Sequence, residues 1–176
     1  MIKKIIKNFK TKGMVGHSSK FLIKKMIGNI DFSKDLVIVQ YGSGKAVFVK
    51  QILKKMSKNS KLYVFEIDER CNKYVEEIND SRLIYINDSA EKVFDYVSEK
   101  KVDVVVSTLP FGSLPKDLLK SIISNSKKIL KENGLFLQYQ YFLTDKKAIE
   151  NIFGIKSKIS FELINFPPAF IYKIQK

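Results

Sequence analysis

The sequence predicts an α/β protein with a Rossmann-like, doubly wound sheet of seven strands, the last two forming an antiparallel hairpin. Five short apolar runs alternate with helical patterns along most of the chain, which favours parallel strands joined by right-handed crossovers. Two further runs close the chain, at 158–163 and 169–174, and a short segment with two prolines separates them. Because a parallel connection needs about a dozen residues or more, these two runs are expected to pair antiparallel at one edge of the sheet.

The individual elements follow from their own patterns. Runs rich in Val, Ile and Tyr are typical of buried strands, and they place strands near 36–41, 62–67, 83–87, 102–107 and 134–141. The stretches that follow these strands have helical spacing, which predicts helices near 44–58, 70–79, 89–99, 115–131 and 145–153. Before the first strand, Ser18 or Ser19 can cap a helix that contains Leu22 and Met26 and ends near Gly28.

Composition narrows the class of protein. The chain has 176 residues, enough for one domain with a sizeable core, and its 32 basic and 18 acidic residues give a net charge of +14. The electrostatic field of such a positive charge attracts polyanions, either nucleic acid or an anionic membrane surface. With one cysteine, Cys71, and one histidine, His17, the chain can form no internal disulfide and no Cys/His metal site, which points to the cytoplasm. No apolar run approaches the ~20 residues of a membrane span.

Residues 1–30 are expected to form a basic segment in front of a continuous domain over residues 31–176. Eight lysines and no acidic residue precede Asp31. On a helix, an apolar stripe bordered by lysines would form from Ile2, Ile5, Ile6 and Phe9. This pattern is typical of a helix that lies in a membrane interface, and it is equally compatible with a terminal helix docked on its own domain.

A glycine turn follows the first expected strand. Gly42 and Gly44 come directly after a β-branched run, where a missing Cβ lets the backbone approach a ligand. About twenty residues on, the second strand ends in Glu66, whose carboxylate can accept hydrogen bonds from ribose hydroxyls. A Walker phosphate loop is excluded, because it needs a glycine at the position of Val39 and a hydroxyl residue at that of Ala46. A mononucleoside cofactor fits this turn best.

The fold pattern, the glycine turn and the acid after the second strand together resemble class I S-adenosylmethionine-dependent methyltransferases. The resemblance spans nearly the whole chain and implies that S-adenosylmethionine is the cofactor. It implies that Gly42 and Gly44 receive the methionine and ribose part and that Glu66 binds the ribose hydroxyls. Asp88, with Ser89 beside it, is expected to meet the adenine. Gln40 stands at a cofactor position where the family often has an acid, which predicts a weaker hold on the cofactor.

Three further motifs are similar to those of bacterial phospholipid N-methyltransferases, which methylate phosphatidylethanolamine. They are Gly16-His17-Ser18-Ser19, the loop from Ser107 to Pro115, and Asn165-Phe166-Pro167-Pro168-Ala169, with Gln138-Tyr139-Gln140-Tyr141 near the fifth strand. The resemblance implies that the substrate is met by Ser18, Ser19, Leu109, Pro110 and Tyr139. His17 and Thr108 depart from the family pattern.

Methyl transfer to nitrogen needs a neutral amine held in line with the methyl group, so positioning dominates the catalysis. Tyr141 and Ser107 are the expected catalytic residues, acting as orienting groups, because a phenol of pKa about 10 is a poor base at neutral pH. Tyrosine rings can also hold a partly methylated, cationic amine by cation–π attraction. One of Tyr139 and Tyr141 is alternatively expected to face the core as an ordinary strand aromatic.

The leading hypothesis is an N-methyltransferase that acts on a phospholipid headgroup while bound peripherally to the cytoplasmic face of an anionic membrane. The first alternative keeps the fold and changes the acceptor to RNA, as in the related ribosomal RNA adenine dimethylases. Those enzymes usually have an asparagine where this chain has Ser107, and they continue into a helical domain. The second alternative is a basic binding protein that keeps the fold without catalysis, and no metal is expected in any of them.

Overall fold

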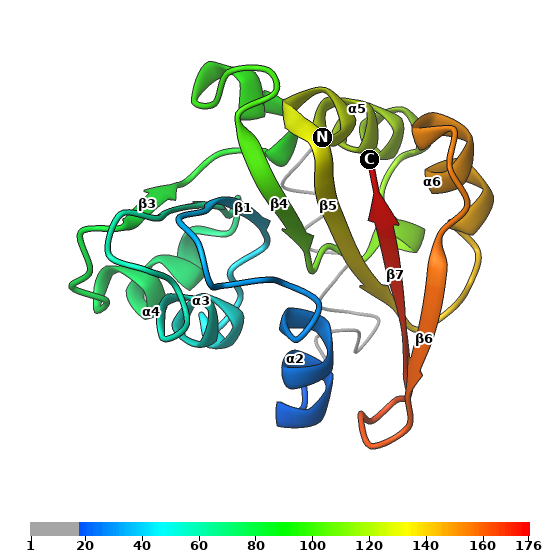
Figure 1. The fold of residues 1–176 in the computed structure, drawn as a ribbon. Helices are drawn as coiled ribbons and strands as arrows, with labels where there is room; N and C mark the ends of the chain where they lie inside the picture. The colour runs from blue at the N-terminus through cyan, green and yellow to red at the C-terminus, as the bar shows by residue number, and fades with distance from the viewer. Residues whose placement is uncertain (1–17) are drawn as a thin grey trace.

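The computed structural model describes residues 18–176, which form one seven-stranded sheet in the order β3-β2-β1-β4-β5-β7-β6 (Figure 1). The strands are β1 Val37–Tyr41, β2 Lys61–Phe65, β3 Leu83–Ile86, β4 Val102–Ser107, β5 Leu130–Gln140, β6 Lys158–Glu162 and β7 Ala169–Gln175. Strands β1 to β5 pair in parallel, whereas β7 runs antiparallel to both β5 and β6. The predicted fold class, including the closing hairpin, is therefore confirmed.

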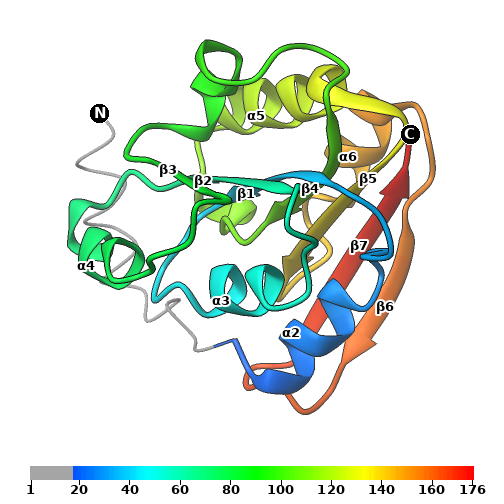
Figure 2. The ribbon, with the colours of Figure 1, turned by 60° about the vertical axis from the view of Figure 1, so that its left-hand side comes forward.

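Helices cover both faces of the sheet (Figures 1 and 2). The α-helices are α2 Lys20–Ile27, α3 Val47–Leu53, α4 Asn72–Glu76, α5 Lys116–Ile129 and α6 Lys146–Phe153, and the 3-10 segments are η1 Glu69–Cys71, η2 Ala90–Asp95 and η3 Phe111–Ser113. Helices α2, α3 and α4 pack on one face, and α5, α6 and η2 pack on the other. Within residues 18–176, none of the helices has the length and apolar character that a membrane crossing requires.

Alternation along the strands supplies a separate core for each face. Ile38 and Val104 point to the face of α2 and α3, whereas Val39 and Val105 point to the face of α5 and α6. All four side chains are buried, as expected for parallel strands covered on both sides. The sheet is consequently a rigid platform, and the loops at the carboxyl ends of its strands are free to form a site.

Helix α2 joins the main core. It begins at the predicted cap, where the Ser19 hydroxyl accepts a hydrogen bond from the Leu22 N–H at 3.1 Å, and its C-cap is Gly28. Leu22 and Met26 are completely buried against the same cluster as α3. The lysine-bordered stripe expected over residues 2–9 lies outside the described residues.

Several predicted boundaries differ from the structure, for local reasons. Helix α3 begins at Val47 and not near 44, because Gly44 (φ +50°) and Ala46 (φ 58°) are in the left-handed region, which cannot lie inside an α-helix. The helix expected over 89–99 is the 3-10 segment η2, interrupted at Lys92 (φ −88°, ψ 17°). That expected over 70–79 is reduced to η1 and the five-residue α4.

The fifth strand is longer than predicted. It follows α5 without a loop, since Leu130 is both the C-cap of the helix and the first residue of β5. The pairing with β4 shifts register between Val102 and Val104, and Asn133 adopts a left-handed conformation (φ 62°). This irregularity lies at the amino end of β5, so the carboxyl end beside the site keeps a regular register.

Candidate functional site

A cavity of about 510 Å³ opens at the carboxyl ends of the parallel strands. Strands β1 and β4 lie side by side there, although they are far apart in the chain, and such a switch point is where doubly wound sheets bind ligands. Ten of the predicted site residues line this cavity: Ser18, Gly42, Gly44, Glu66, Asp88, Ser89, Leu109, Pro110, Tyr139 and Tyr141. Residues from six separate segments of the chain thus meet around one volume.

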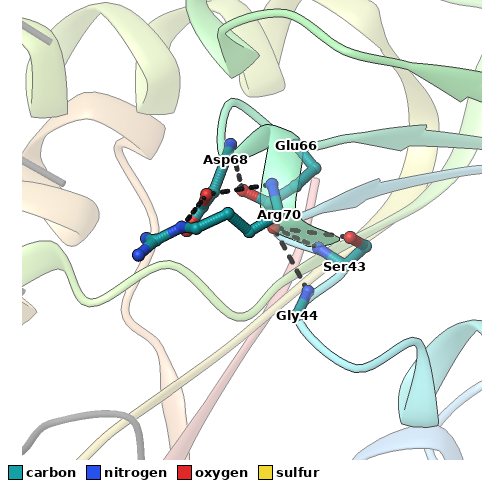
Figure 3. A network of polar contacts seen from close by, with 5 residues as sticks. All are labelled: Ser43, Gly44, Glu66, Asp68 and Arg70. Carbon is teal, nitrogen blue, oxygen red and sulfur yellow. Dashed lines mark hydrogen bonds and ion pairs between the residues drawn. The ribbon is translucent and has the colours of Figure 1, made fainter. Parts of the chain in front are cut away.

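Glu66 ties the glycine turn to the end of β2 (Figure 3). Its Oε2 accepts hydrogen bonds from the backbone N–H groups of Ser43, at 3.0 Å, and of Gly44, at 3.1 Å. Its Oε1 accepts one from the Asp68 N–H at 3.0 Å, and Asp68 in turn forms an ion pair with Arg70. These two N–H groups and the Ser43 hydroxyl, at 3.4 Å, occupy Oε2 and fix the turn, while Oε1, which accepts one hydrogen bond, keeps further acceptor capacity.

Thr108 joins the glycine turn to the loop after β4. The Thr108 hydroxyl donates to the Gly42 carbonyl at 3.0 Å, and the Thr108 N–H donates to the Tyr41 carbonyl at 2.9 Å. Gly42 has φ +81°, and a Cβ added there would stand 2.8 Å from the Thr108 hydroxyl oxygen. At Gly44 (φ +50°) an added Cβ would meet nothing within 4 Å, so this residue borders open space. Thr108, a departure from the phospholipid methyltransferase pattern, therefore has a structural role.

Asp88 occupies the loop after β3, as predicted. Its carboxylate accepts hydrogen bonds from the Ser89 N–H at 2.7 Å, from Lys92 at 3.1 Å and from the Tyr96 hydroxyl at 3.3 Å. Burial raises the pKa of Asp88, but the Ser89 and Lys92 contacts outweigh it, and the pKa lies below its ordinary value. Ser89 caps η2 by accepting from the Glu91 N–H. An ionised carboxylate therefore lines the cavity just beyond β3, the strand that pairs with β2, which ends before Glu66.

Two glutamines on β5 hold the loop after β4. The side-chain amides of Gln138 and Gln140 both donate to the Leu109 carbonyl, each at 2.9 Å. The Ser107 hydroxyl accepts from the Leu109 N–H at 3.4 Å. Leu109 and Pro110 are thereby fixed at the cavity wall, and the Leu109 carbonyl oxygen has both lone pairs occupied.

Tyr139 and Tyr141 form an aromatic wall. Residues two apart on a strand share a face, and both rings line the cavity in an edge-to-face pair with centroids 6.0 Å apart. Both rings also pack against the core cluster that contains Phe48, so contact with the core, the alternative expected for one of them, accompanies their position at the cavity. Phe48 stacks on Tyr139 at 6.2 Å, and Ser18 donates a hydrogen bond to the Tyr139 hydroxyl at 3.2 Å. Burial raises the pKa of Tyr139 to about 12, although the Ser18 contact opposes the rise.

The Tyr141 hydroxyl is buried without a hydrogen-bond partner of normal geometry among residues 18–176. Burial raises its pKa, while the nearby Tyr139 and Asn165 side chains partly oppose that rise. A buried hydroxyl without a partner costs free energy in the free protein, which a ligand that supplies the missing hydrogen bond would recover.

Three predicted residues do not line the cavity. Ser107 is completely buried below the Leu109 turn, so any contribution to methyl transfer has to pass through the position of that turn. Gln40 is also completely buried; its amide donates to the Gly42 carbonyl at 2.8 Å, and its Oε1 has no partner within the described part of the chain. Ser19 acts as the cap of α2.

Sequence reasoning missed several residues of the site. Phe48, Gln140 and Thr144 line the cavity, and the buried Asp145 stands behind Thr144, whose hydroxyl donates to its carboxylate at 3.2 Å. Burial raises the pKa of Asp145, and the Thr144 contact opposes that rise. The sequence indicated Gln140 through the Gln138-Tyr139-Gln140-Tyr141 motif and not through the alternation of faces, because Gln138, two residues away, does not line the cavity. For Thr144 and Asp145 the sequence offers no comparable pattern.

The residues present fit S-adenosylmethionine. The volume lies within the range of about 300–1,000 Å³ that small-molecule sites occupy. Glu66 and Asp88 offer carboxylate oxygens that can accept hydrogen bonds from the hydroxyl and amino groups of an adenosine, and Phe65, Leu118 and Ile122 add an apolar wall. The open space at Gly44 leaves room for the cofactor chain, and the two carboxylates suit a ligand that carries positive charge.

Comparison with known proteins identifies the family of the chain. Residues 9–162 match the model of the family described as methyltransferase small domain. An ornithine lipid N-methyltransferase from Singulisphaera acidiphila is 24% identical over 160 residues, which are 88% of this chain and 83% of that protein. A relationship to ribosomal RNA adenine dimethylases, implied by the sequence resemblance, has no support from these comparisons.

Two solved structures share the fold at low sequence identity. A SAM-dependent methyltransferase from Aquifex aeolicus has a TM-score of 0.66 at 12% identity, covering 97% of this chain and 96% of that one. A 1,6-didemethyltoxoflavin-N1-methyltransferase from Burkholderia thailandensis, solved with S-adenosylhomocysteine, has a TM-score of 0.74 at 7% identity, covering 99% and 86%. With a matched family model over most of its length and a cavity that fits the cofactor, the chain belongs to the methyltransferase small domain family and is an S-adenosylmethionine-dependent methyltransferase.

Proposed function

We propose that this enzyme transfers the methyl group to the amine of a lipid headgroup, of the phosphatidylethanolamine or ornithine lipid type. The observation that carries the proposal is the wall formed by Tyr139 and Tyr141. The neighbouring part of the cavity is lined by Ser18, Leu109, Pro110, Gln140, Phe142 and Thr144, and none of these described residues carries a charge. A neutral aromatic wall suits both a neutral amine and its methylated, cationic product, which tyrosine faces attract by roughly 0.5–2 kcal/mol.

The likeness to an ornithine lipid N-methyltransferase supports the same class of acceptor, because that protein covers nearly the same length. The motifs at Ser18-Ser19 and at Asn165 add support, since the structure brings them together. The Asn165 Oδ1 accepts a hydrogen bond from the Ser19 N–H at 2.8 Å, and Ser18 contacts Tyr139. Motifs from both ends of the described chain therefore meet beside one cavity.

The roles of the chain's own residues follow from these contacts. When bound, S-adenosylmethionine supplies an electrophilic methyl group on a sulfonium. Because burial raises the pKa of Tyr141, its phenol stays protonated at neutral pH and orients the amine by hydrogen bonding without acting as a strong base. The Leu109 carbonyl, occupied by two amides, serves to fix the loop.

The test is methyl transfer from radiolabelled S-adenosylmethionine by the purified full chain. Vesicles of phosphatidylglycerol with phosphatidylethanolamine, vesicles with ornithine lipid, and total RNA are offered as separate acceptors. Label extracted with a lipid is the expected result and identifies the headgroup. Label in RNA alone would transfer the assignment to nucleic acid, and absence of label in all three, with cofactor binding intact, would refute the lipid assignment.

Replacement of Tyr141 by Phe tests the acceptor side of the proposal. Tyr141→Phe removes a buried hydroxyl that has no hydrogen-bond partner of normal geometry among residues 18–176, so the free energy of unfolding should stay nearly constant. The value of kcat/KM for the lipid should fall roughly tenfold or more, while the Kd for the cofactor stays unchanged. Tyr63→Phe, on β2 and outside the cavity, is the matched control. Full activity of Tyr141→Phe would refute this role.

A further inference from the structure

We propose that the tip of the β6–β7 hairpin and the adjacent face of α2 form a docking surface for an anionic lipid bilayer. This docking surface consists of Leu163, Ile164 and Phe166 on the hairpin and Phe21 and Lys24 on α2. The inference rests on the proposed function, because it supplies the way in which a headgroup within a membrane reaches the cavity.

The apolar side chains of this surface are unusually exposed. Phe166 is 91% exposed, Leu163 71%, Ile164 62% and Phe21 54%. A groove lined by Phe21, Lys24, Lys25 and Ile164 runs between α2 and the hairpin, so these groups belong to one continuous surface. Contiguous exposed apolar residues in a folded protein mark an interaction surface, whereas single ones are ordinary.

The tip is held in place. Asn165, in the middle of the tip, is 1% exposed; it accepts from the Ser19 N–H at 2.8 Å and donates to the Pro167 carbonyl at 2.7 Å. The Ile164 N–H donates to Glu162 at 3.0 Å. The chain buries its polar residue and presents its apolar neighbours outward, the reverse of the usual arrangement at a loop tip.

This surface lies at the same end of the molecule as the cavity. In Figures 1 and 2 the hairpin tip and α2 stand together at the end of the sheet where β4 and β5 finish. Ser18, just before α2, lines the cavity and contacts Tyr139, whereas the next residue, Ser19, is bonded to the tip through Asn165. A bilayer in contact with the tip would therefore face the cavity mouth.

Charge selects an anionic bilayer as the occupant. Helix α2 carries Lys20, Lys24 and Lys25, and the nearby Glu162 is already paired with Lys25 at 3.6 Å. Apolar side chains bordered by lysines match an anionic lipid interface. The acyl chains accommodate the apolar side chains, and the negative headgroups attract the lysines. A second copy of the chain would bring like charges together, since the net charge is +14.

A single tryptophan tests the insertion of the tip. The chain contains no tryptophan, so Phe166→Trp creates a unique fluorophore at the most exposed position, and Ile155→Trp provides a control at the opposite end of β6. The probe is a vesicle of phosphatidylglycerol and phosphatidylcholine, which offers no amine to methylate. We expect a blue shift and quenching by brominated acyl chains for Phe166→Trp alone. Sedimentation with vesicles without this shift, or a shift that depends on protein concentration without vesicles, would overturn the proposal.

The variant Leu163→Ser/Ile164→Ser/Phe166→Ser separates docking from chemistry. Vesicle affinity should fall on the order of tenfold or more, while cofactor affinity and methylation of a short-chain, monomeric amine lipid stay unchanged. Unchanged vesicle affinity would overturn the docking surface even if lipid is methylated. Conversely, docking with no label in either lipid would contradict the proposed function and leave the docking surface standing.

Discussion

Gly42 and Thr108 show how single atoms shape the cavity. The left-handed backbone of Gly42 brings its carbonyl against the Thr108 hydroxyl, at a distance that leaves no room for a Cβ. The neighbouring Ala46 is also left-handed, yet it is completely buried behind the turn. The requirement for glycine at position 42 is therefore steric as well as conformational.

Gly42→Ala should weaken cofactor binding by at least about tenfold, because the turn has to shift to relieve the contact with Thr108. Gly154→Ala is the matched control: that glycine also has a positive φ of 72°, but an added Cβ would meet nothing within 4 Å, and it lies outside the cavity. Both variants carry the left-handed strain of about 1 kcal/mol. Calorimetry with S-adenosylmethionine checks the difference, and equal losses in both variants would contradict the steric argument.

Asp145 gives a pH-dependent prediction. Burial raises the pKa of Asp145 in the folded protein above the unfolded value of about 3.9. As the pH rises from the unfolded pKa to the folded pKa, the unfolded chain ionises more readily, and the folded state loses stability. Asp145→Asn should therefore raise the Tm near neutral pH and give no gain below about pH 3.9. Thermal unfolding across pH measures this effect, and an equal gain at every pH would refute it.

Ionisation of Asp80 has the opposite effect on folding stability to that of Asp145. The hydrogen bond from Arg82 lowers its pKa, so the ionised form contributes stability above the unfolded value of about 3.9 and loses it as the pH falls through the folded pKa. Asp80→Asn should consequently lower the Tm at neutral pH and have a smaller effect in acid.

At the scale of elements, the strands could be predicted because each is a local apolar run, and β4 matches its predicted bounds, 102–107. The acids at the ends of β2 and β3 could be placed by order alone, since parallel strands end on one side. The hydrogen-bond partner of Gln138 and Gln140 could not be predicted, because this acceptor, the Leu109 carbonyl, lies 29 and 31 residues away from them in the chain. Register between strands decides such contacts, and no local pattern encodes it.

The hairpin tip and α2 should depend on each other through Asn165. Asn165→Ala leaves the Ser19 N–H and the Pro167 carbonyl without their side-chain partner, and we expect a loss of about 1–3 kcal/mol in the free energy of unfolding. Asn151→Ala, at an exposed position of α6, should change it by less than about 0.5 kcal/mol. Denaturant unfolding compares the two, and an equal effect would show that Asn165 does not anchor the tip.

At the scale of the whole molecule, the net charge of +14 and the exposed apolar tip should act on vesicle binding in separable ways. Raising the salt from 0.1 M to 1 M shortens the Debye length from about 10 to about 3 Å, which weakens the lysine contribution and leaves apolar burial intact. Binding to phosphatidylglycerol vesicles should therefore fall to a plateau above zero. In the triple serine variant of the tip, the plateau should disappear.

The contact between Thr108 and Gly42 has one more consequence, because it connects two ligand sites. Under the proposed function, Gly42 belongs to the part of the cavity wall assigned to the cofactor, and Thr108 to the loop whose next residues, Leu109 and Pro110, are assigned to the acceptor. If binding of one ligand shifts this contact and so changes the affinity for the other, the coupling between the two is reciprocal. The factor by which bound cofactor changes the affinity for lipid then equals the factor by which bound lipid changes the affinity for cofactor. A cofactor titration at several lipid concentrations would therefore report lipid binding without any methyl transfer.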